Sequence, residues 1–310
     1  MRVYQGIEEF DKIDKAVVTT GTFDGVHIGH QSILNRLNEL AKKVGGQSVL
    51  LTFFPHPRMV IHPDAEIQLI NTIEERTALL EAAGVQHLII HPFTKEFSRL
   101  SSVEFVRDLL VNKIGTEHLV IGYDHHFGRN REGSFEHLME FGPLYGFQVE
   151  EIPAQDIDEV NVSSTKIRKA LIAGEVRTAN EFLGHAFTLS GSVVKGNQIG
   201  RTLGFPTANI QLNNPHKLIP ADGIYAVRVM FKGKVFKGML NIGVRPTIEG
   251  ANKRSIEVNI FDFNAEIYGR HIQLQLIERI RDEQKFNSLD SLKFAMAHDK
   301  TRSLEILSKW

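Results

Sequence analysis

Two histidines spaced three residues apart are the first candidates for chemistry in this sequence. His27 and His30 end the segment Gly-Thr-Phe-Asp-Gly-Val-His-Ile-Gly-His, which lies between a β-branched run at 16–20 and apolar residues at helical spacing. Where a strand gives way to a helix, free backbone N–H groups and the helix dipole favour an anion, and glycines let a ligand approach closely. Both imidazoles could therefore donate hydrogen bonds to phosphate.

The residues alone leave two other interpretations of this pair open. His27 could cap a turn, with His30 as a solvated residue of the first helical turn. A metal site would need a third ligand, and zinc sites on helices commonly use a spacing of four. The segment resembles the H-x-G-H signature of the nucleotidylyltransferase superfamily. That resemblance implies that the histidines stabilise the α-phosphate of ATP during an in-line attack, with Gly21 and Phe23 beside them.

Composition limits the classes of function. The chain has 310 residues, 42% of them hydrophobic, which favours two domains. The chain has 36 Lys and Arg residues and 37 Asp and Glu residues, a net charge of −1. It therefore lacks the excess of positive charge that indicates a nucleic-acid partner. The absence of cysteine excludes disulfides and thiolate sites. No run reaches the roughly 18 apolar residues of a membrane span, and no signal peptide is evident, so we expect a cytoplasmic protein without membrane contact.

The first half of the chain has the alternation of a doubly wound α/β sheet. After the strand at 16–20, strands are expected over 48–54, 87–91 and 118–122, and helices over 73–83 and 102–114. Ser101 and Glu104 form a capping box at the start of the last helix. Ligands of such sheets collect at the carboxyl ends of the strands. Because His27, His56 and Asp124 each follow a strand, we expect them to converge on one crevice.

The pattern changes after about residue 186. Short alternating segments with turns rich in Gly, Asn and Lys indicate an antiparallel barrel or sandwich. The strands are expected over 187–194, 223–230, 234–240, 255–261 and 272–280, and a helix closes the chain over 289–308. Helices are also expected over 164–173 and up to 182. The predicted domains are therefore residues 1–184 and 185–310.

Three further segments of the first half carry polar groups. Prolines fix the backbone at Pro55 and on the other side of His56, which is typical of a rigid turn or of a ligand contact. After the strand at 118–122, Asp124 could accept a hydrogen bond from a ribose or a base, and nearby arginines could bind phosphate. The alternative is that this segment is a solvated loop. The segment 163–168 brings hydroxyls and cations to a helix start.

That last segment is either an ordinary N-cap or a phosphate site. Its hydroxyls and cations suit the β- and γ-phosphates of a nucleotide. The stretch resembles the second signature of the nucleotidylyltransferase superfamily, which implies that Ser164, Thr165 and Arg168 bind phosphate.

In the second half, a basic glycine-rich loop precedes a Pro-Thr-Ala-Asn segment. The loop lacks the ending of a Walker motif. Thr207 and Asn209, two apart on an extended segment, share a face and could hold Mg²⁺ beside nucleotide phosphates. Glu257 is the candidate base, with Asp262 as its rival, because phosphorylation of an alcohol needs a carboxylate to accept the hydroxyl proton. A solvent-facing strand position is the alternative for Glu257.

Together these segments resemble the bacterial bifunctional riboflavin kinase/FAD synthetase family. In the second half the resemblance rests on residues 200–209, 223–225, 241–247, 257 and 280–286. It implies a six-stranded antiparallel barrel in which Gly200, Gly204, Thr207 and Asn209 hold Mg-ATP, while Glu257 activates the 5′-hydroxyl of riboflavin. Arg281 would line the flavin end. In the first half, FMN would attack ATP to give FAD and pyrophosphate, with Pro55, His56 and Asp124 in the flavin crevice.

The chain departs from the family pattern at three places. His125-His126 stands where an aromatic and a basic residue are commoner, His185 replaces an arginine, and Asn259 replaces a histidine. Two other hypotheses therefore accompany the bifunctional enzyme. One is an enzyme that makes only FMN, and the other is a non-catalytic flavin or nucleotide sensor. Retention of the histidine pair, Arg168, Thr207 and Glu257 argues against a sensor.

Overall fold

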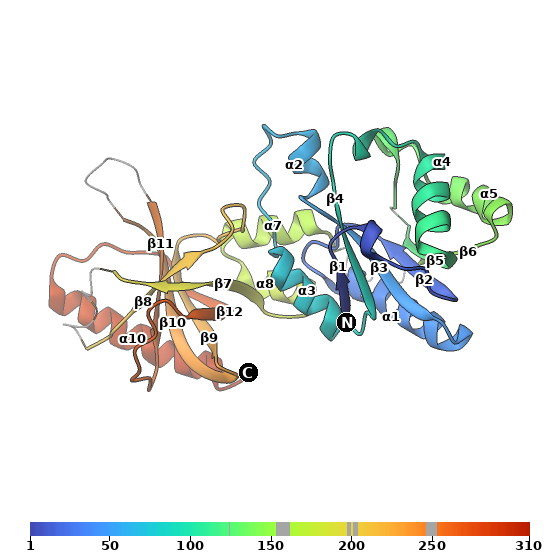
Figure 1. The fold of residues 1–310 in the computed structure, drawn as a ribbon. Coiled ribbons are helices and arrows are strands. Elements are labelled where there is room, and N and C mark those ends of the chain that lie inside the picture. The colour runs from blue at the N-terminus through green and yellow to red at the C-terminus, as the bar shows by residue number, and fades with distance from the viewer. Residues whose placement is uncertain (124, 153–161, 197–199, 201–203, 246–252) are drawn as a thin grey trace. The chain divides into compact units, whose positions relative to one another are not determined.

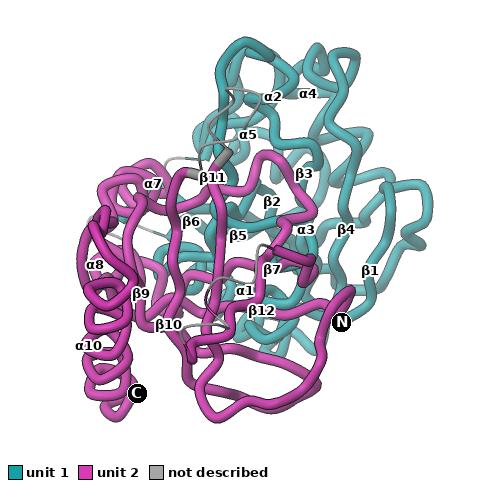
Figure 2. Tube along the Cα trace, turned by 90° about the vertical axis from the view of Figure 1, so that its left-hand side faces the viewer, with its two compact units in different colours: residues 1–163 teal, residues 164–310 magenta. Residues whose placement is uncertain are grey.

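The computed structural model describes residues 1–123, 125–152, 162–196, 200, 204–245 and 253–310. The chain forms two compact units, Met1–Ser163 and Ser164–Trp310 (Figure 2). The unit boundary falls before the helices at 164–183, whereas the predicted functional domains divide after residue 184. Those two helices are therefore part of the second compact unit.

Unit 1 is built on a six-stranded parallel sheet (Figure 1). Its order is β1-β4-β3-β2-β5-β6, and every pair is parallel. The strands are β1 (Arg2–Tyr4), β2 (Ala16–Thr20), β3 (Gln47–Phe54), β4 (His87–Pro92), β5 (Thr116–Gly122) and β6 (Gln148–Ile152). The helices are η1 (Ile7–Glu9), α1 (Ile28–Val44), α2 (Pro57–Ile61), α3 (Ile73–Ala82), η2 (Phe97–Arg99), α4 (Ser102–Glu104), η3 (Phe105–Ile114), η4 (Arg129–Arg131) and α5 (Phe135–Tyr145). The doubly wound prediction is confirmed.

Alternate residues of the central strands belong to two separate hydrophobic cores, one on each face of the sheet. Val18 and Leu51 pack with η3 and α5, whereas Val17 and Leu50 pack with α1 and α3. This alternation buries both sheet faces, as parallel sheets require. Because α1 follows the end of β2, the β2–α1 junction lies at the carboxyl edge of the parallel sheet, where ligands of such folds bind.

Side-chain caps define where the helices of unit 1 begin. The Ser101 hydroxyl accepts a hydrogen bond from the backbone N–H of Glu104, and the Glu104 carboxylate accepts one from the backbone N–H of Ser101. The predicted capping box is therefore confirmed. The helix continues into η3, which is π-helical. Thr72 and Glu75 form a second capping box at α3.

Unit 2 is a closed antiparallel barrel in the order β10-β11-β8-β7-β12-β9. Its strands are β7 (Phe187–Val194), β8 (Ala208–Leu212), β9 (Gly223–Phe231), β10 (Lys234–Arg245), β11 (Lys253–Ile260) and β12 (His271–Arg281). Helices α7 (Ser164–Ala173) and α8 (Val176–Leu183) precede it, and α10 (Leu289–Leu307) follows it. The six-stranded barrel and the terminal helix are confirmed.

Two polar contacts fix α8 and α10 on the barrel. Asn180 of α8 donates to the carbonyl of Leu276 at 2.8 Å and accepts from the backbone of Phe187 at 2.7 Å. Arg281 makes a two-pronged ion pair with Asp299 of α10, at 2.9 and 2.7 Å. Both contacts join segments that are far apart in sequence to a barrel strand.

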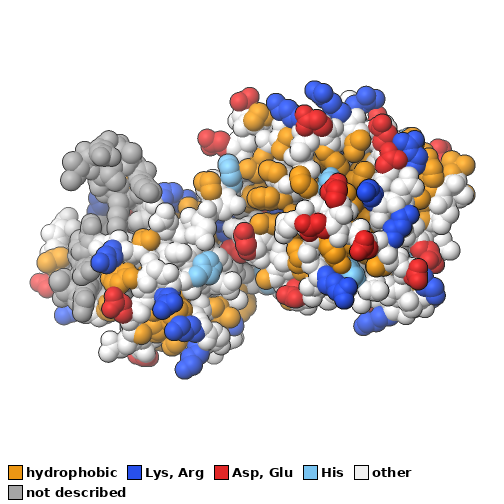
Figure 3. All heavy atoms as spheres, viewed as in Figure 1, with side chains coloured by type: hydrophobic (Ala, Val, Ile, Leu, Met, Phe, Trp, Pro, Cys, Tyr) orange, Lys and Arg blue, Asp and Glu red, His pale blue; other side chains and the backbone are white. Residues whose placement is uncertain are grey.

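The surface has mixed charge. On the face of unit 1 drawn in Figure 3, acidic and basic side chains are interspersed among apolar ones. Within the described ranges, no helix combines the length and the apolar character that a bilayer span requires.

Candidate active sites

His27 and His30 stack at the junction of β2 and α1. Their ring centroids are 3.6 Å apart with an interplanar angle of 16°, and the Phe23 ring packs on His30 at 4.8 Å. His27 is the N-cap of α1, and its Nδ1 accepts from the backbone N–H of His30 at 3.3 Å. The cap interpretation and the ligand interpretation are compatible, because capping uses one ring nitrogen. In a neutral His27 ring, an accepting Nδ1 places the proton on Nε2, where it can be donated.

Burial makes His30 a neutral donor rather than a cation. Desolvation holds the pKa of His30 well below its ordinary value of 6.5, and the nearby His27 and Arg76 lower it further. Its Nδ1 is buried and has no hydrogen-bond partner. A neutral imidazole can donate a hydrogen bond to a phosphate oxygen and so orient it, without itself carrying a charge.

The loop before the histidines is held in uncommon backbone conformations. Phe23 and Val26 have φ values of 48° and 41°, and Gly25 has φ of 98°. Bulky and β-branched residues rarely adopt positive φ, and such strain gathers at functional sites. At Gly21, a Cβ would approach the Phe23 ring to 3.1 Å, so this position also favours glycine.

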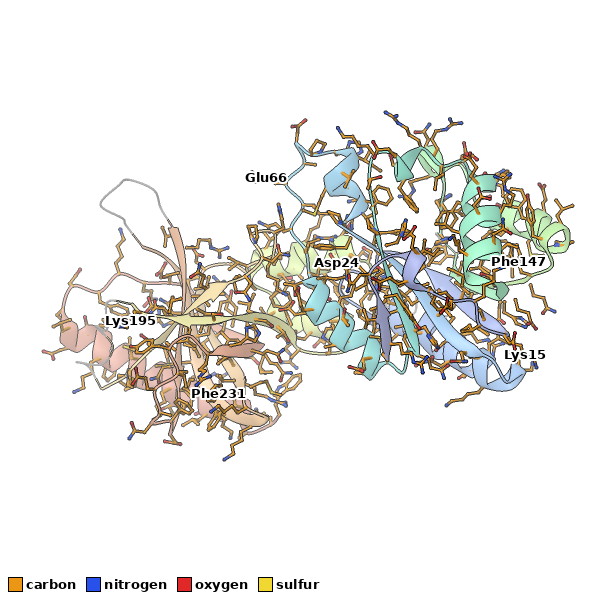
Figure 4. The ribbon with its side chains drawn as sticks, viewed as in Figure 1. Lys15, Asp24, Glu66, Phe147, Lys195 and Phe231 are labelled. Atoms are coloured by element: carbon orange, nitrogen blue, oxygen red, sulfur yellow. The ribbon has the colours of Figure 1, made fainter. Side chains whose placement is uncertain are left out.

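Asp24 anchors this loop from inside the unit (labelled in Figure 4). Its carboxylate accepts from the backbone N–H groups of Ile70 and Asn71, at 3.1 and 3.0 Å, and lies 3.6 Å from Arg76 of α3. Asp24 and Arg76 are each only 1% exposed. Sequence reasoning missed this contact, since nothing in the amphipathic pattern of residues 73–83 marks an arginine as buried.

We expect Asp24→Asn to destabilise unit 1 by about 3–5 kcal/mol, the cost of breaking a buried ion pair. An amide also offers one acceptor where the carboxylate accepts two N–H groups. Urea unfolding measures the loss, with Asp64→Asn, an exposed aspartate, as control. A decrease in the free energy of unfolding of less than about 1 kcal/mol would show that the Asp24–Arg76 pair does not stabilise unit 1 appreciably.

The candidate flavin-binding residues of the first half follow β3 and β5 of unit 1 in the sequence. His56 is buried and is the N-cap of α2, with its Nδ1 accepting from Arg58 at 3.2 Å, directly after Pro55. Asp124 lies outside the described residues. Next to it, His125 stacks on Phe127 at 5.9 Å, and desolvation, with smaller effects of His126 and Arg131, lowers its pKa to about 4.

Ser164, Thr165 and Arg168 occupy the first turns of α7. Ile167, Ala170 and Leu171 form the buried face of this helix, while Thr165 is exposed and Ser164 and Arg168 are half-buried. The hydroxyls therefore lie at a helix N-terminus, as the sequence predicts. Because α7 belongs to unit 2, its role beside the histidines stays a prediction.

The second candidate site is a cavity of about 620 Å³ in unit 2. Residues of β9, β10, β11 and β12, the segment after β12 and α10 surround it. The lining residues are Thr207, Ile224, Met239, Leu240, Asn241, Glu257, Asn259, Arg281, Glu283, Gln284, Phe286, Asn287, Ser288, Leu289, Leu292, Met296 and Asp299. Polar groups meet an apolar wall there, which suits an aromatic ligand with a polar chain.

Glu257 stands at the polar end of this cavity. Thr207 donates from Oγ1 to Glu257 Oε2 at 3.2 Å. In the strand register, Glu257 lies directly opposite Asn209 of β8 and Asn241 of β10. The structure thus brings Glu257 together with Thr207 and Asn209, the pair that the sequence singled out in another segment. Asp262, the rival base, is exposed and is not among the lining residues.

The described part of the glycine-rich loop folds against Asn209. A Cβ at Gly196 would collide with the Asn209 amide, so any larger residue there would displace this side chain. Phe205 donates to the carbonyl of Gly200 at 2.8 Å, and Gly204 has φ of 84°. Asn259, at the position expected to be histidine, donates from Nδ2 to the carbonyl of Pro206 at 2.7 Å. Asn259 thereby fixes the residue before Thr207.

Arg281 is one of the lining residues, and its guanidinium is engaged by Asp299. The Phe286 ring lies 5.6 Å from the guanidinium carbon. No local pattern indicates this ion pair, because Asp299 lies 18 residues downstream in α10.

The oxygen donors around Glu257 fit a magnesium ion. Mg²⁺ prefers hard oxygen ligands and is usually bound through one or two carboxylates together with phosphates and water. The Thr207 hydroxyl, the Asn209 amide and the Glu257 carboxylate are of this kind. In the described part of the chain, no group of three or more His, Cys, Asp or Glu residues is arranged to hold a metal.

Comparisons with known proteins match both halves. Residues 10–166 match the family model of FAD synthetase, and residues 183–307 match that of riboflavin kinase. The bifunctional riboflavin kinase/FMN adenylyltransferase of Pseudomonas fluorescens is 38% identical, covering 91% of this chain and 90% of that protein. The protein of the same name from Escherichia coli K12 is 37% identical, covering 98% and 97%.

A solved structure resembles the whole chain. It is titled as a macrolide-efflux protein from Streptococcus pneumoniae, is 32% identical and covers 97% of both chains with a TM-score of 0.87.

Proposed function

Because the chain belongs to the family of bifunctional riboflavin kinase/FMN adenylyltransferases, we propose which of its residues carry out each of the two reactions. The enzyme phosphorylates riboflavin to FMN with ATP in its C-terminal half and adenylylates FMN to FAD, with release of pyrophosphate, in its N-terminal half. ATP, riboflavin and FMN are its small-molecule substrates. Membership of this family favours the bifunctional enzyme over the FMN-only enzyme and the sensor.

In the kinase, Glu257 is the base. Its carboxylate accepts the proton of the riboflavin 5′-hydroxyl while that oxygen attacks the γ-phosphorus of ATP, and ADP leaves. The observation that carries this assignment is the bond from Thr207 to Glu257, which fixes one carboxylate oxygen at the cavity. Gly200 and Gly204 let the loop backbone approach the phosphates.

Thr207 and Asn209 are the magnesium ligands in this proposal. A bound Mg²⁺ neutralises charge on the phosphates of ATP. The Thr207 hydroxyl donates a hydrogen bond to Glu257, so the lone pairs of its oxygen would be available to the metal. Asn209 is 9% exposed and lies directly opposite Glu257, so its side chain reaches the same end of the barrel.

We expect Asn209→Ala to raise the Mg²⁺ concentration for half-maximal FMN formation by on the order of 10-fold or more. The Mg²⁺ dependence of FAD formation from supplied FMN should not change, since that reaction uses the other half of the chain. Asn213→Ala, at an exposed position just after β8, is the control. An unchanged Mg²⁺ dependence of FMN formation in Asn209→Ala would contradict metal ligation.

In the adenylyltransferase, His27 and His30 bind the α-phosphate of ATP. The phosphate oxygen of FMN attacks the α-phosphorus, the bond to the β-phosphate oxygen breaks, and pyrophosphate leaves. No proton transfer is required, so the protein acts by positioning and by stabilising charge. The stacked pair, in which burial keeps the His30 ring neutral, suits that task. Gly21 and Phe23 shape the approach to them, and Ser164, Thr165 and Arg168 bind the pyrophosphate being released.

The flavin contacts and the location complete the proposal. Pro55, His56 and Asp124 contact FMN in the first half, and Arg281 supports the flavin end of the kinase cavity. The functional domains are residues 1–184 and 185–310. We place the enzyme in the cytoplasm, because both reactions consume ATP.

A further inference from the structure

We propose that Asn241 is a riboflavin-binding residue of the kinase, whose side-chain oxygen accepts a hydrogen bond from the 4′-hydroxyl of the ribityl chain. This inference rests on the proposed function of Glu257 as the base that takes up the 5′-hydroxyl proton. Asn241 itself is in the central part of β10, where it lines the cavity.

Asn241 is placed beside the reacting end of the substrate by the strand register. It lies directly opposite Glu257 of β11 on one side and Ile224 of β9 on the other. Side chains at directly opposite positions of antiparallel strands have Cβ atoms about 5 Å apart. A group held by Glu257 and a group held by Asn241 are therefore neighbours on the same ligand.

The side-chain oxygen of Asn241 lacks a partner. Oδ1 is buried and makes no hydrogen bond, and it is the only such buried polar side-chain atom among the described lining residues. The polar groups around it are engaged: Thr207 with Glu257, Asn259 with Pro206, and Arg281 with Asp299. A buried acceptor without a donor is rare and calls for an explanation. A ligand donor supplies one.

The chemistry of the substrate identifies that donor. An amide oxygen accepts hydrogen bonds from hydroxyl or N–H groups, and the ribityl chain carries four hydroxyls in a row. With the 5′-hydroxyl at Glu257, the hydroxyl on the next carbon is the one nearest to the opposite strand position. The apolar wall formed by Met239, Leu240 and Leu292 then faces the ring system rather than the chain.

The test compares riboflavin with 4′-deoxyriboflavin in the full-length enzyme. Asn241→Leu keeps the approximate shape of the side chain and removes the acceptor. We expect it to lower kcat/KM for riboflavin by about 10- to 100-fold and to leave the KM for ATP unchanged. On 4′-deoxyriboflavin, the variant and the wild type should agree within about 2-fold. The melting temperature should not fall, since an unpaired buried polar atom is being removed.

Two variants separate the possible failures. Asn259→Leu removes the bond to Pro206 and should lose the same factor on both flavins, because it acts through the protein backbone. If Asn241→Leu also loses the same factor on both flavins, or loses nothing on riboflavin, the inference is wrong. Glu257→Gln measured in parallel tests the underlying assignment: full kinase activity in that variant would overturn the proposed function together with the inference.

Discussion

Glu257→Gln is expected to reduce FMN formation by about 10²- to 10⁴-fold, the usual contribution of general base catalysis. Glutamine keeps the size of the side chain and still accepts from Thr207, but its neutral amide cannot take up the proton of the 5′-hydroxyl. FMN formation is measured by chromatography of the flavins after incubation with ATP and magnesium.

The same protein supplies the control for folding. Glu257→Gln should convert supplied FMN to FAD at the wild-type rate, because the adenylyltransferase half is unchanged. Asp262→Asn, the exposed rival carboxylate, should retain kinase activity. If Asp262→Asn lost activity and Glu257→Gln kept it, the base would be misassigned.

His30→Ala should reduce FAD formation from supplied FMN by about 10²- to 10³-fold, the range seen when one donor to a developing charge is removed. The reason is that His30 lies against His27 at the helix start, where the α-phosphate is expected to bind. FMN formation should stay at the wild-type rate. His30→Gln, which retains an N–H donor, should recover part of the loss.

The pH dependence adds a second criterion for His30. Its pKa is held well below 6.5 by burial, so the ring is neutral throughout the neutral range. The factor lost in His30→Ala should therefore be the same at about pH 6.5 and about pH 8. A factor that grew as the pH fell would mean that the protonated ring does the work, contrary to this account.

Local patterns predicted much of the framework. The range predicted for the first barrel strand, 187–194, coincides with β7, because its alternating residues are alternately buried. The capping box at Ser101 was also predictable, since both of its members are close in sequence. By contrast, β8 was not predicted as a strand. Its five residues are stabilised by pairing with β7 and β11, which no local pattern reports.

What the sequence could not provide are contacts between distant segments. The Asp24–Arg76 pair, the Arg281–Asp299 pair and the unpaired oxygen of Asn241 all depend on tertiary packing. The residue types at Thr207, Asn209 and Glu257 suggest a kinase site from the sequence alone. Only the register of β8, β10 and β11 shows that these residues, with Asn241, are neighbours.

If two separate sites on one chain act in sequence, two variants that each lack one activity should complement each other when they are mixed. Equal amounts of Glu257→Gln and His30→Ala are incubated with riboflavin, ATP and magnesium, and the flavins are resolved over time. Alone, the first variant should leave riboflavin unchanged and the second should stop at FMN, whereas the mixture should make FAD. Loss of both activities in each single variant, with no FAD from the mixture, would contradict the account and indicate one shared site.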